Sequence, residues 1–399
     1  MMPLSTMRRF DTWVGWPAAV LLGLVPHRRR TLPVAPRQIV IVKLSGLGSL
    51  LTCAGVFRAL RSSQPQARLV VVSLEGTAAA ARLIPEVDEV LAISVAGVGR
   101  MLRDGWRVLR ELRRRRVEVM ADIECFSKLS TVFCALAGAR YRMGFRLPAR
   151  WRRRLIDGGC TFREDIHFCA CVARLLQPLG VDYGRLPAAI LRPSPAAEEA
   201  ATALLAEAPG ARADTDWMVV NPHASELCVQ RRWPVERFAQ VVSALLQQHP
   251  ALRIAIPGTA GERARAEALR ASLPAEQRER VRVLAGRTDL GTLAAILRRS
   301  RLVLTGDTGV MHLSAAVGAP TVALFGPESP VRYGPVGGLH AGRTGPVDRV
   351  LTGDVPCGPC LSYMNHKRAP CQVEPAACML AISADDVQRA CADVLKGAG

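Results

Sequence analysis

The chain has 399 residues, of which 49% are hydrophobic, and its formal net charge is +19. This length favours two domains, each with enough apolar residues for its own core, and the excess of arginine points to anionic partners such as a membrane surface, a phosphorylated glycolipid or a nucleotide. We expect no nucleic-acid partner, because aromatic residues make up only 5% of the chain and no helix-turn-helix, finger or RNA-recognition signature is present in the sequence.

The first predicted element is the apolar stretch WVGWPAAVLLGLVP at residues 13–26, which lies between Arg8-Arg9 and Arg28-Arg29-Arg30. It is shorter than the roughly 17–25 residues that a helix needs to cross a bilayer. A signal peptide would not be followed by a basic run in place of its cleavage site. We therefore predict that residues 1–35 associate with a membrane surface, with tryptophans at headgroup depth and arginines on anionic lipid. The alternative is an N-terminal helix packed on the protein body.

From residue 38 onward, short Val/Ile/Leu-rich runs alternate with helical patterns, beginning with QIVIVKL, RLVVVSL, EVLAISV and VEVMADIE. The alternation pauses in a Pro/Ala-rich segment at residues 193–216 and restarts at WMVVNPH. Apolar runs without polar alternation are typical of parallel strands that are covered on both faces. We predict an α/β protein with two Rossmann-like, doubly wound parallel-sheet domains at residues 36–205 and 215–399, and ligands in a cleft between them.

A glycine turn follows the first predicted strand in VIVKLSGLGSL, residues 40–50. Such turns commonly hold phosphates. Here Lys43 and Ser45 are candidates to contact an anion, and Gly46 and Gly48 would let the backbone come close to it.

A better phosphate site is predicted in LVLTGDTGVMHLSAAVGAPTVALFGP, residues 302–327. A strand, a tight turn and a helix would leave backbone N–H groups at the helix N-terminus for a diphosphate. The Thr308 hydroxyl and the His312 ring would reach the same anion. The alternative is that Asp307 and Thr308 only cap the helix and that His312 is a surface histidine.

Together with NPHASELCVQRRWPVERFAQVV, APTVALFGP and the cysteine-rich closing segment, this turn resembles the heptosyltransferase family of bacterial glycosyltransferases, family 9, from about residue 38 to the C-terminus. The resemblance implies the GT-B fold and an inverting, metal-independent transferase that moves a sugar, typically heptose, from a nucleotide-diphosphate donor such as ADP-heptose to lipopolysaccharide core or another glycolipid or saccharide. The C-terminal domain would bind the donor and the N-terminal domain the acceptor. The implied location is cytoplasmic, on the inner face of the bacterial inner membrane.

The resemblance also assigns residues. Arg231 stands where the family usually has a lysine, and it would neutralise the departing diphosphate. Glu262 matches an acidic residue that faces the nucleoside, although a carboxylate is also favoured at any helix N-terminus. The donor-binding turn corresponds to Asp307, Thr308, Gly309 and His312.

The first glycine turn departs from the family at Ser49, where relatives usually carry an aspartate that is the proposed base. A serine hydroxyl cannot accept a proton at neutral pH without a base of its own. We therefore predict that the base lies in MADIECFSKLS, residues 120–130, as Glu124 or, second, Asp122; both could instead be ordinary polar residues at a strand end. The alternative functions are a catalytically degenerate binding or scaffold protein and a transferase for protein or secondary-metabolite acceptors.

Four of the twelve cysteines cluster near the C-terminus, as CGPC followed by two more. A structural zinc or iron site, a redox dithiol and inert thiols all fit this spacing. None of these readings makes the cluster catalytic, and we expect no cofactor for catalysis. The residues concerned are Cys357, Cys360, Cys371 and Cys378.

Overall fold

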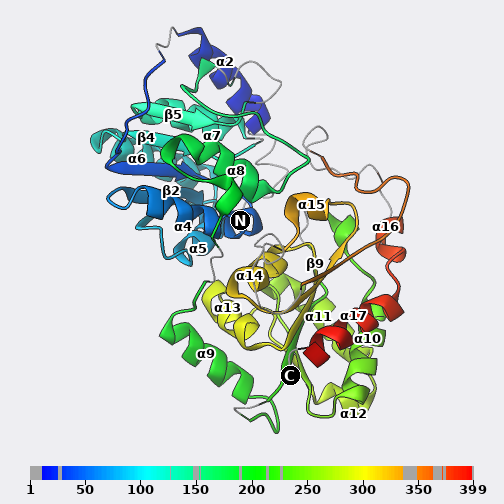
Figure 1. The fold of residues 1–399 in the computed structure, drawn as a ribbon. Helices are drawn as coiled ribbons and strands as arrows, with labels where there is room; N and C mark the ends of the chain where they lie inside the picture. Colours follow the sequence, from blue (N-terminus) through cyan, green and yellow to red (C-terminus); the bar gives the residue numbers. More distant parts are fainter. Residues whose placement is uncertain are drawn as a thin grey trace. The chain divides into compact units, whose positions relative to one another are not determined.

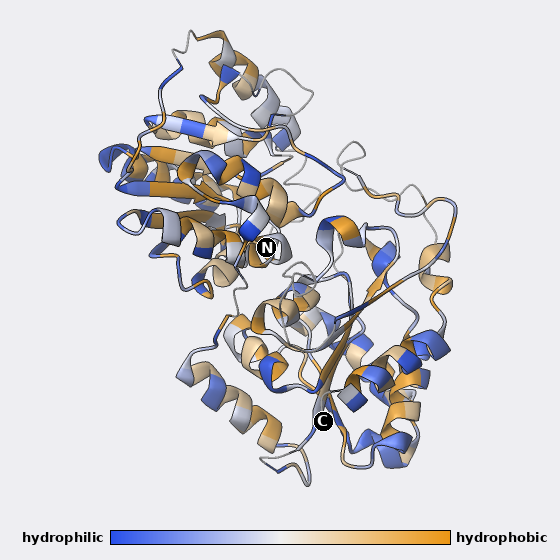
Figure 2. Ribbon diagram, in the orientation of Figure 1, coloured by the Kyte–Doolittle hydropathy of each residue, from blue (hydrophilic) through white to orange (hydrophobic). Residues whose placement is uncertain are grey.

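The computed structural model describes residues 11–25, 29–125, 127–146, 152, 154–187, 191–212, 215–224, 228–335, 348–362, 371 and 374–397. The chain divides into two compact units, Met1–Ala189 and Ile190–Gly399 (Figure 1). Each unit contains a parallel sheet with helices around it, as the alternation of apolar runs and helical patterns predicts. The strands of both sheets are largely hydrophobic (Figure 2), which fits burial on both faces.

The first unit has a five-stranded sheet in the order β3-β2-β1-β4-β5, and all neighbouring strands are parallel. The order reverses between β1 and β4, so the carboxyl ends of these two strands form a topological switch point, where doubly wound sheets bind ligands. The strands are β1 (Gln38–Val42), β2 (Arg68–Leu74), β3 (Glu89–Ile93), β4 (Val119–Asp122) and β5 (Tyr141–Gly144); the helices are α3 (Leu47–Leu51), α4 (Ala54–Ser63), α5 (Glu75–Arg82), α6 (Val98–Arg114), α7 (Lys128–Ala137), α8 (Phe168–Leu176), η3 (Gln177–Leu179) and η4 (Tyr183–Arg185).

Beyond β5, residues 158–161 run alongside the edge of the sheet through bridges at Gly158 and Thr161. A Cβ atom on Gly158 would lie 1.8 Å from the Tyr141 hydroxyl oxygen. Gly159 has φ of +155°, and its Cβ would lie 1.9 Å from the carbonyl oxygen of Gly144. Only glycine therefore allows this segment to approach β5 so closely.

The N-terminal helices η1 (Asp11–Gly15) and α2 (Trp16–Leu24) pack on α7 of the first unit. Ala19 is fully buried against Val132 and Leu155. The opposite side of the segment is apolar and open to solvent, with Trp13 78% and Trp16 52% exposed. One face of η1 and α2 therefore packs on the protein body, which was the alternative stated for this segment. The other face is apolar and exposed. None of the helices in the described part of the chain has the length and apolar character needed to cross a membrane.

The second unit has a six-stranded parallel sheet in the order β11-β10-β9-β6-β7-β8. The strands are β6 (Trp217–Asn221), β7 (Arg253–Ile256), β8 (Val281–Val283), β9 (Leu302–Gly306), β10 (Thr321–Phe325) and β11 (Arg349–Thr352); the helices are α9 (Pro195–Ala206), η5 (Val229–Arg231), α10 (Val235–Gln248), η6 (Ala260–Glu262), α11 (Arg263–Ala271), α12 (Ala275–Arg278), α13 (Leu290–Arg299), α14 (Gly309–Val317), α15 (Pro330–Tyr333), α16 (Ala377–Leu380) and α17 (Ala384–Gly397).

The position of α9 differs from the predicted domain boundary, which placed residues up to 205 in the first domain. In the structure α9 belongs to the second unit, because its apolar side, including Ala201 and Leu205, is buried where α9 packs on α13. Just before α9, the backbone N–H of Leu191 donates a 2.7 Å hydrogen bond to the carbonyl oxygen of Ala316. The second unit therefore begins before residue 191.

Candidate functional site

The glycine turn between β9 and α14 presents uncovered backbone amides. Thr308 is the N-cap residue of α14, but its side chain makes no capping hydrogen bond to the helix. Its Oγ1 instead accepts a 3.0 Å hydrogen bond from Asn221 Nδ2 and lies 3.2 Å from Thr305 Oγ1. Thr308 is thus held by strand ends, not by the helix. This leaves the α14 amides and the positive end of the helix dipole for an anion, as the diphosphate interpretation requires.

Arg231, Asp307 and His312 come together at this turn. Arg231 Nη1 lies 3.1 Å from Asp307 Oδ2, and His312 Nε2 lies 3.8 Å from Asp307 Oδ1. A Cβ atom on Gly306 would lie 3.5 Å from the carbonyl oxygen of Arg231, so the loop after β6 packs directly on the turn. The structure therefore gathers the basic residue and the DTGxxH turn, which lie far apart in the sequence.

Glu328 completes this site, although the sequence did not single it out. Its side chain is almost fully buried; Oε2 lies 3.3 Å from Arg231 Nη2, and Oε1 lies 3.5 Å from Arg332 Nη1. Burial lowers the pKa of Arg231, but Asp307 and Glu328 more than offset this effect, so its pKa is raised and its charge is secure. Polar residues directly after β10, in GPES, are the signal that would have suggested Glu328.

Glu262 holds its own turn. Its Oε2 accepts hydrogen bonds from the Thr259 backbone N–H (2.7 Å) and hydroxyl (2.9 Å), which is a capping box. The structure thus shows the helix-terminal carboxylate that was the alternative for Glu262, and contact with a nucleoside stays a prediction.

His223 lies close to this turn. A Cβ on Gly258 would lie 3.3 Å from Glu262 Cβ and 2.9 Å from Nε2 of the buried His223. Burial lowers the pKa of His223, and Glu262 opposes that shift.

In the first unit, Glu124 ties the end of β4 to the first glycine turn. Its Oε2 lies 3.1 Å from Lys43 Nζ, and its Oε1 accepts a 2.7 Å hydrogen bond from the backbone N–H of Ser45. Lys43 and Glu124 are each only 5% exposed. Two of the residues predicted for the acceptor side therefore meet the predicted base at the switch point of this sheet.

Asp122 has a different environment. Its carboxylate is fully buried and accepts hydrogen bonds from Arg152 Nη2 (2.6 Å), Thr131 Oγ1 (2.8 Å) and Ser130 Oγ (3.0 Å) on one oxygen, and from the Glu124 backbone N–H on the other. Burial raises the pKa of Asp122, while Arg152 and the hydroxyl groups oppose that shift. A carboxylate enclosed in this way cannot touch an acceptor. The geometry therefore corrects the prediction for Asp122, which supports the fold.

Ser49 and the glycines shape the first turn. The Ser49 hydroxyl donates a 2.8 Å hydrogen bond to the carbonyl oxygen of Gly46. Gly46 has φ of +89°, and a Cβ there would lie 2.6 Å from Ser49 Oγ, so this position requires glycine. Gly48 lies within α3. The bond that Ser49 makes is structural, and the part of the chain described here gives its hydroxyl no basic partner.

The cysteine segment is attached to the loop after β10, because the backbone N–H of Cys360 donates to the carbonyl oxygen of Pro327. Burial raises the pKa of Cys360 to about 11, and the neighbouring thiols of Cys371, Cys378 and Cys357 add to this rise, so the four thiols share one region. All four are free thiols. Across the described ranges, no three His, Cys, Asp or Glu side chains are arranged to hold a metal ion, so the metal site stays a prediction.

The chain resembles known proteins over most of its length. The family model Glycosyltransferase family 9 (heptosyltransferase) matches residues 173–363. Lipopolysaccharide heptosyltransferase 2 of Salmonella typhimurium is 26% identical over 326 residues, which cover 79% of this chain and 89% of that protein. The structure of Escherichia coli ADP-heptose lps heptosyltransferase II superposes with a TM-score of 0.70 at 19% identity, covering 90% of this chain and 99% of that one.

A second solved structure has an additional feature. The iron-containing dodecameric glycosyltransferase TibC of enterotoxigenic Escherichia coli matches with a TM-score of 0.53 at 13% identity, covering 92% of this chain and 78% of that one. Two parallel-sheet units and these similarities agree with one another. The chain has the GT-B fold, and from residue 173 to 363 it matches glycosyltransferase family 9, the heptosyltransferase family.

Proposed function

We propose that this glycosyltransferase moves heptose from ADP-heptose to a lipopolysaccharide core acceptor with inversion at the anomeric carbon. The observation that carries the proposal is the meeting of Arg231 with Asp307 and His312 at the uncapped N-terminus of α14. The names of two similar proteins include lipopolysaccharide and ADP-heptose, which supports this choice of acceptor and donor.

On the donor side, the bond that breaks joins the anomeric carbon of the sugar to an oxygen of the diphosphate. As it breaks, the diphosphate gains negative charge. Arg231, His312 and the α14 amides would stabilise this charge in place, without a divalent metal. Thr308 would contribute its hydroxyl, which Asn221 and Thr305 already orient.

On the acceptor side, Glu124 would accept the proton of the attacking hydroxyl as that oxygen bonds to the anomeric carbon. Lys43 and the Ser45 amide hold the Glu124 side chain at the first glycine turn. Both oxygens of the Glu124 carboxylate are engaged in these contacts. They therefore also fit one competing function, a catalytically degenerate member that binds the donor without transferring the sugar.

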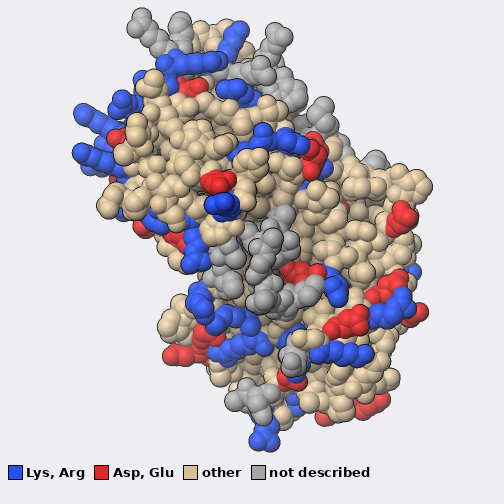
Figure 3. Space-filling view, in the orientation of Figure 1, with Lys and Arg blue, Asp and Glu red and all other residues tan. Residues whose placement is uncertain are grey.

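The proposal places the protein on the cytoplasmic face of the inner membrane. The exposed apolar face of η1 and α2, with Trp13, Trp16, Leu21 and Leu24, supports this placement, since tryptophan and leucine on one side of a helix favour the membrane interface. The basic side chains distributed over the first unit (Figure 3) add attraction to anionic lipid.

A structural zinc or iron ion in the cysteine segment is a further part of the proposal. The shared environment of Cys357, Cys360, Cys371 and Cys378 and the iron-containing relative support it. Metal analysis of the purified protein, with the Cys357→Ser/Cys360→Ser variant as control, tests this part separately from transfer. If the purified wild-type protein contains neither zinc nor iron, the proposed metal site is excluded.

The function is tested by calorimetry with ADP-heptose, followed by a transfer assay on lipopolysaccharide that lacks its core heptoses, with and without a chelator. We expect binding, release of ADP and a product heavier by one heptose, unaffected by the chelator. Tight donor binding without transfer or ADP release would favour the degenerate function. Absence of donor binding would contradict both the transferase function and the degenerate donor-binding function.

A further inference from the structure

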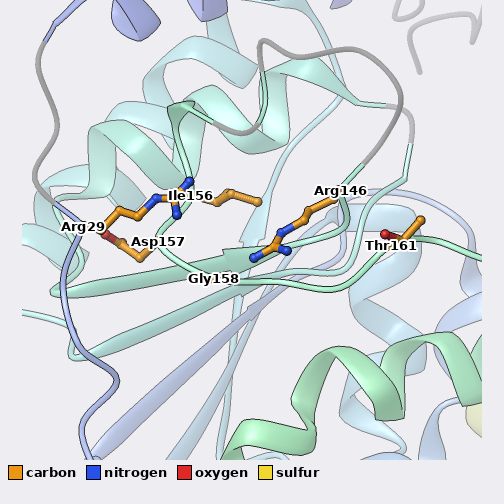
Figure 4. A pocket seen from close by; sticks show the side chains of 6 residues that line it. All are labelled: Arg29, Arg146, Ile156, Asp157, Gly158 and Thr161. Atoms are coloured by element: carbon orange, nitrogen blue, oxygen red, sulfur yellow. The ribbon is translucent and has the colours of Figure 1, made fainter.

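A pocket at the sheet edge of the first unit lies outside the residues assigned to the donor and the acceptor. Its volume is about 190 Å³ (Figure 4). Arg29 comes from the segment after α2, and the other lining residues come from the end of β5 and from the neighbouring edge segment. The lining residues are Arg29, Arg146, Ile156, Asp157, Gly158 and Thr161.

The pocket is lined by two arginines whose side chains pair with none of the residues that the structure describes. The side chains of Arg29 and Arg146 approach it from opposite sides (Figure 4). Neither guanidinium forms a hydrogen bond or an ion pair with any residue that the structure describes. Both residues are exposed, so water screens their mutual repulsion, but an anion in the pocket would be attracted by both cations.

The one carboxylate that lines the pocket is already occupied. Asp157 Oδ1 accepts a 3.0 Å hydrogen bond from the Arg30 backbone N–H, and Oδ2 accepts a 2.9 Å hydrogen bond from the Arg142 backbone N–H. Arg142 Nε also lies 3.6 Å from Oδ2, and the Asp157 side chain is fully buried. Because Asp157 has its own cation in Arg142, the pocket keeps the net positive charge of Arg29 and Arg146.

The shape and chemistry of the pocket suit a phosphate. Its volume corresponds to about six water molecules, at roughly 30 Å³ each, which is room for a phosphate group. Guanidinium groups bind phosphate through paired N–H bonds, and the Thr161 hydroxyl lies on the same wall. Gly158 fixes that wall, since any larger residue would collide with Tyr141.

The pocket lies near the carboxyl end of the N-terminal segment. Val25, at the end of that segment, precedes Arg29 by four residues. A Cβ atom on Gly23 would lie 3.7 Å from the side chain of Arg154, which is two residues before Ile156 of the pocket wall. The end of the apolar segment and the basic pocket thus lie in the same part of the first unit.

We propose that the Arg29–Arg146 pocket binds the headgroup phosphate of an anionic membrane lipid while the apolar face of η1 and α2 lies in the bilayer interface. The inference rests on the membrane association in the proposed function and adds a specific headgroup subsite to it. The lipid phosphate accepts hydrogen bonds from both guanidinium groups, and the acyl chains continue toward Leu21 and Leu24.

Co-sedimentation of the full chain with phosphatidylcholine vesicles tests this inference. One set of vesicles carries phosphatidic acid, and a second set carries the same negative charge as oleate, which has no phosphate. We expect wild type to prefer the phosphatidic acid vesicles, and Arg29→Gln/Arg146→Gln to bind them about 30-fold more weakly and without preference. Arg29→Lys/Arg146→Lys keeps the charge but loses the paired bonds, so we expect about a tenfold loss.

The matched control is Arg82→Gln/Arg185→Gln, which removes the same charge from exposed positions elsewhere in the first unit and should bind both vesicles like wild type. Two results would show general charge attraction and overturn the subsite. One is vesicle binding by Arg29→Lys/Arg146→Lys that equals wild type, and the other is an equal loss of affinity of Arg29→Gln/Arg146→Gln for both kinds of vesicle. Binding of soluble glycerol phosphate at the pocket without vesicle preference would overturn the lipid source. Donor binding and transfer to delipidated acceptor stay unchanged in all these variants, so failure of the enzymatic function is recognised separately.

Discussion

Nη1 of Arg231 lies 3.1 Å from Oδ2 of Asp307, and this ion pair joins the loop after β6 to the glycine turn after β9. The cation is thereby held at the place where a departing diphosphate would meet the α14 amides. This position of the Arg231 charge leads to the first prediction.

Arg231→Gln should lower kcat/KM for transfer by roughly 10²–10³-fold, because the charge on the departing diphosphate loses its fixed cation. Arg231→Lys should lose less, since the charge remains. Arg298→Gln, which breaks only a surface pair with Glu198, serves as the control. Steady-state kinetics with ADP-heptose distinguish these variants, and near-normal turnover of Arg231→Gln would exclude it from the leaving-group site.

Glu328→Gln should reduce the free energy of unfolding by about 3 kcal/mol, because it removes the buried carboxylate that pairs with both Arg231 and Arg332. Glu198→Gln removes a carboxylate that pairs with Arg298 and Arg299 at the surface, and should cost less than about 1 kcal/mol. Urea unfolding measures both. Equal stability losses would mean that the Glu328 network is not stabilising.

Glu124→Gln should reduce transfer by at least about 10²-fold while donor affinity is unchanged, if Glu124 is the base. Asp122→Asn should behave differently: it leaves the buried Arg152 without a full counterion and should lower the unfolding free energy by about 3 kcal/mol. Calorimetry, kinetics and unfolding are compared for the two variants. Retained turnover of Glu124→Gln would eliminate it as the base.

Trp13→Ala/Trp16→Ala should weaken binding to anionic vesicles by about tenfold, because both rings are exposed on the apolar face. Tyr183→Ala, at another exposed aromatic position of the first unit, should leave vesicle binding unchanged. The measurement is the fraction of protein that sediments with vesicles at increasing lipid concentration. Unchanged binding of the tryptophan variant would assign membrane contact to another surface.

Stability should fall in acid through His223. Burial holds the pKa of His223 in the folded protein below its ordinary value of about 6.5. The neutral ring therefore gives its full stability above about pH 6.5, and this contribution is lost as the pH falls through the folded-state pKa. Urea unfolding from pH 8 downward should show a smaller loss for His223→Gln than for wild type and for His249→Gln. Identical pH profiles of all three would refute this role.

The strands and the turn between β9 and α14 could be predicted because their signals are local: buried parallel strands are continuous apolar runs, and the DTGxxH turn follows one of them. The contacts of Glu328 with Arg231 and Arg332 could not, since they depend on how the chain returns after β10. For the same reason the sequence ranked Glu124 before Asp122 but could not show that Arg152 encloses Asp122 while Glu124 contacts the first glycine turn.

The packing of α9 on α13 has a consequence for recombination between relatives. Each unit is one continuous stretch of chain, and α9 covers a surface of the second. A chimaera that joins the second unit of this protein to the first unit of a relative would therefore need a single junction, placed before Leu191. A junction at residue 215 would pair α13 with a foreign helix and expose apolar surface that Ala201 and Leu205 now cover.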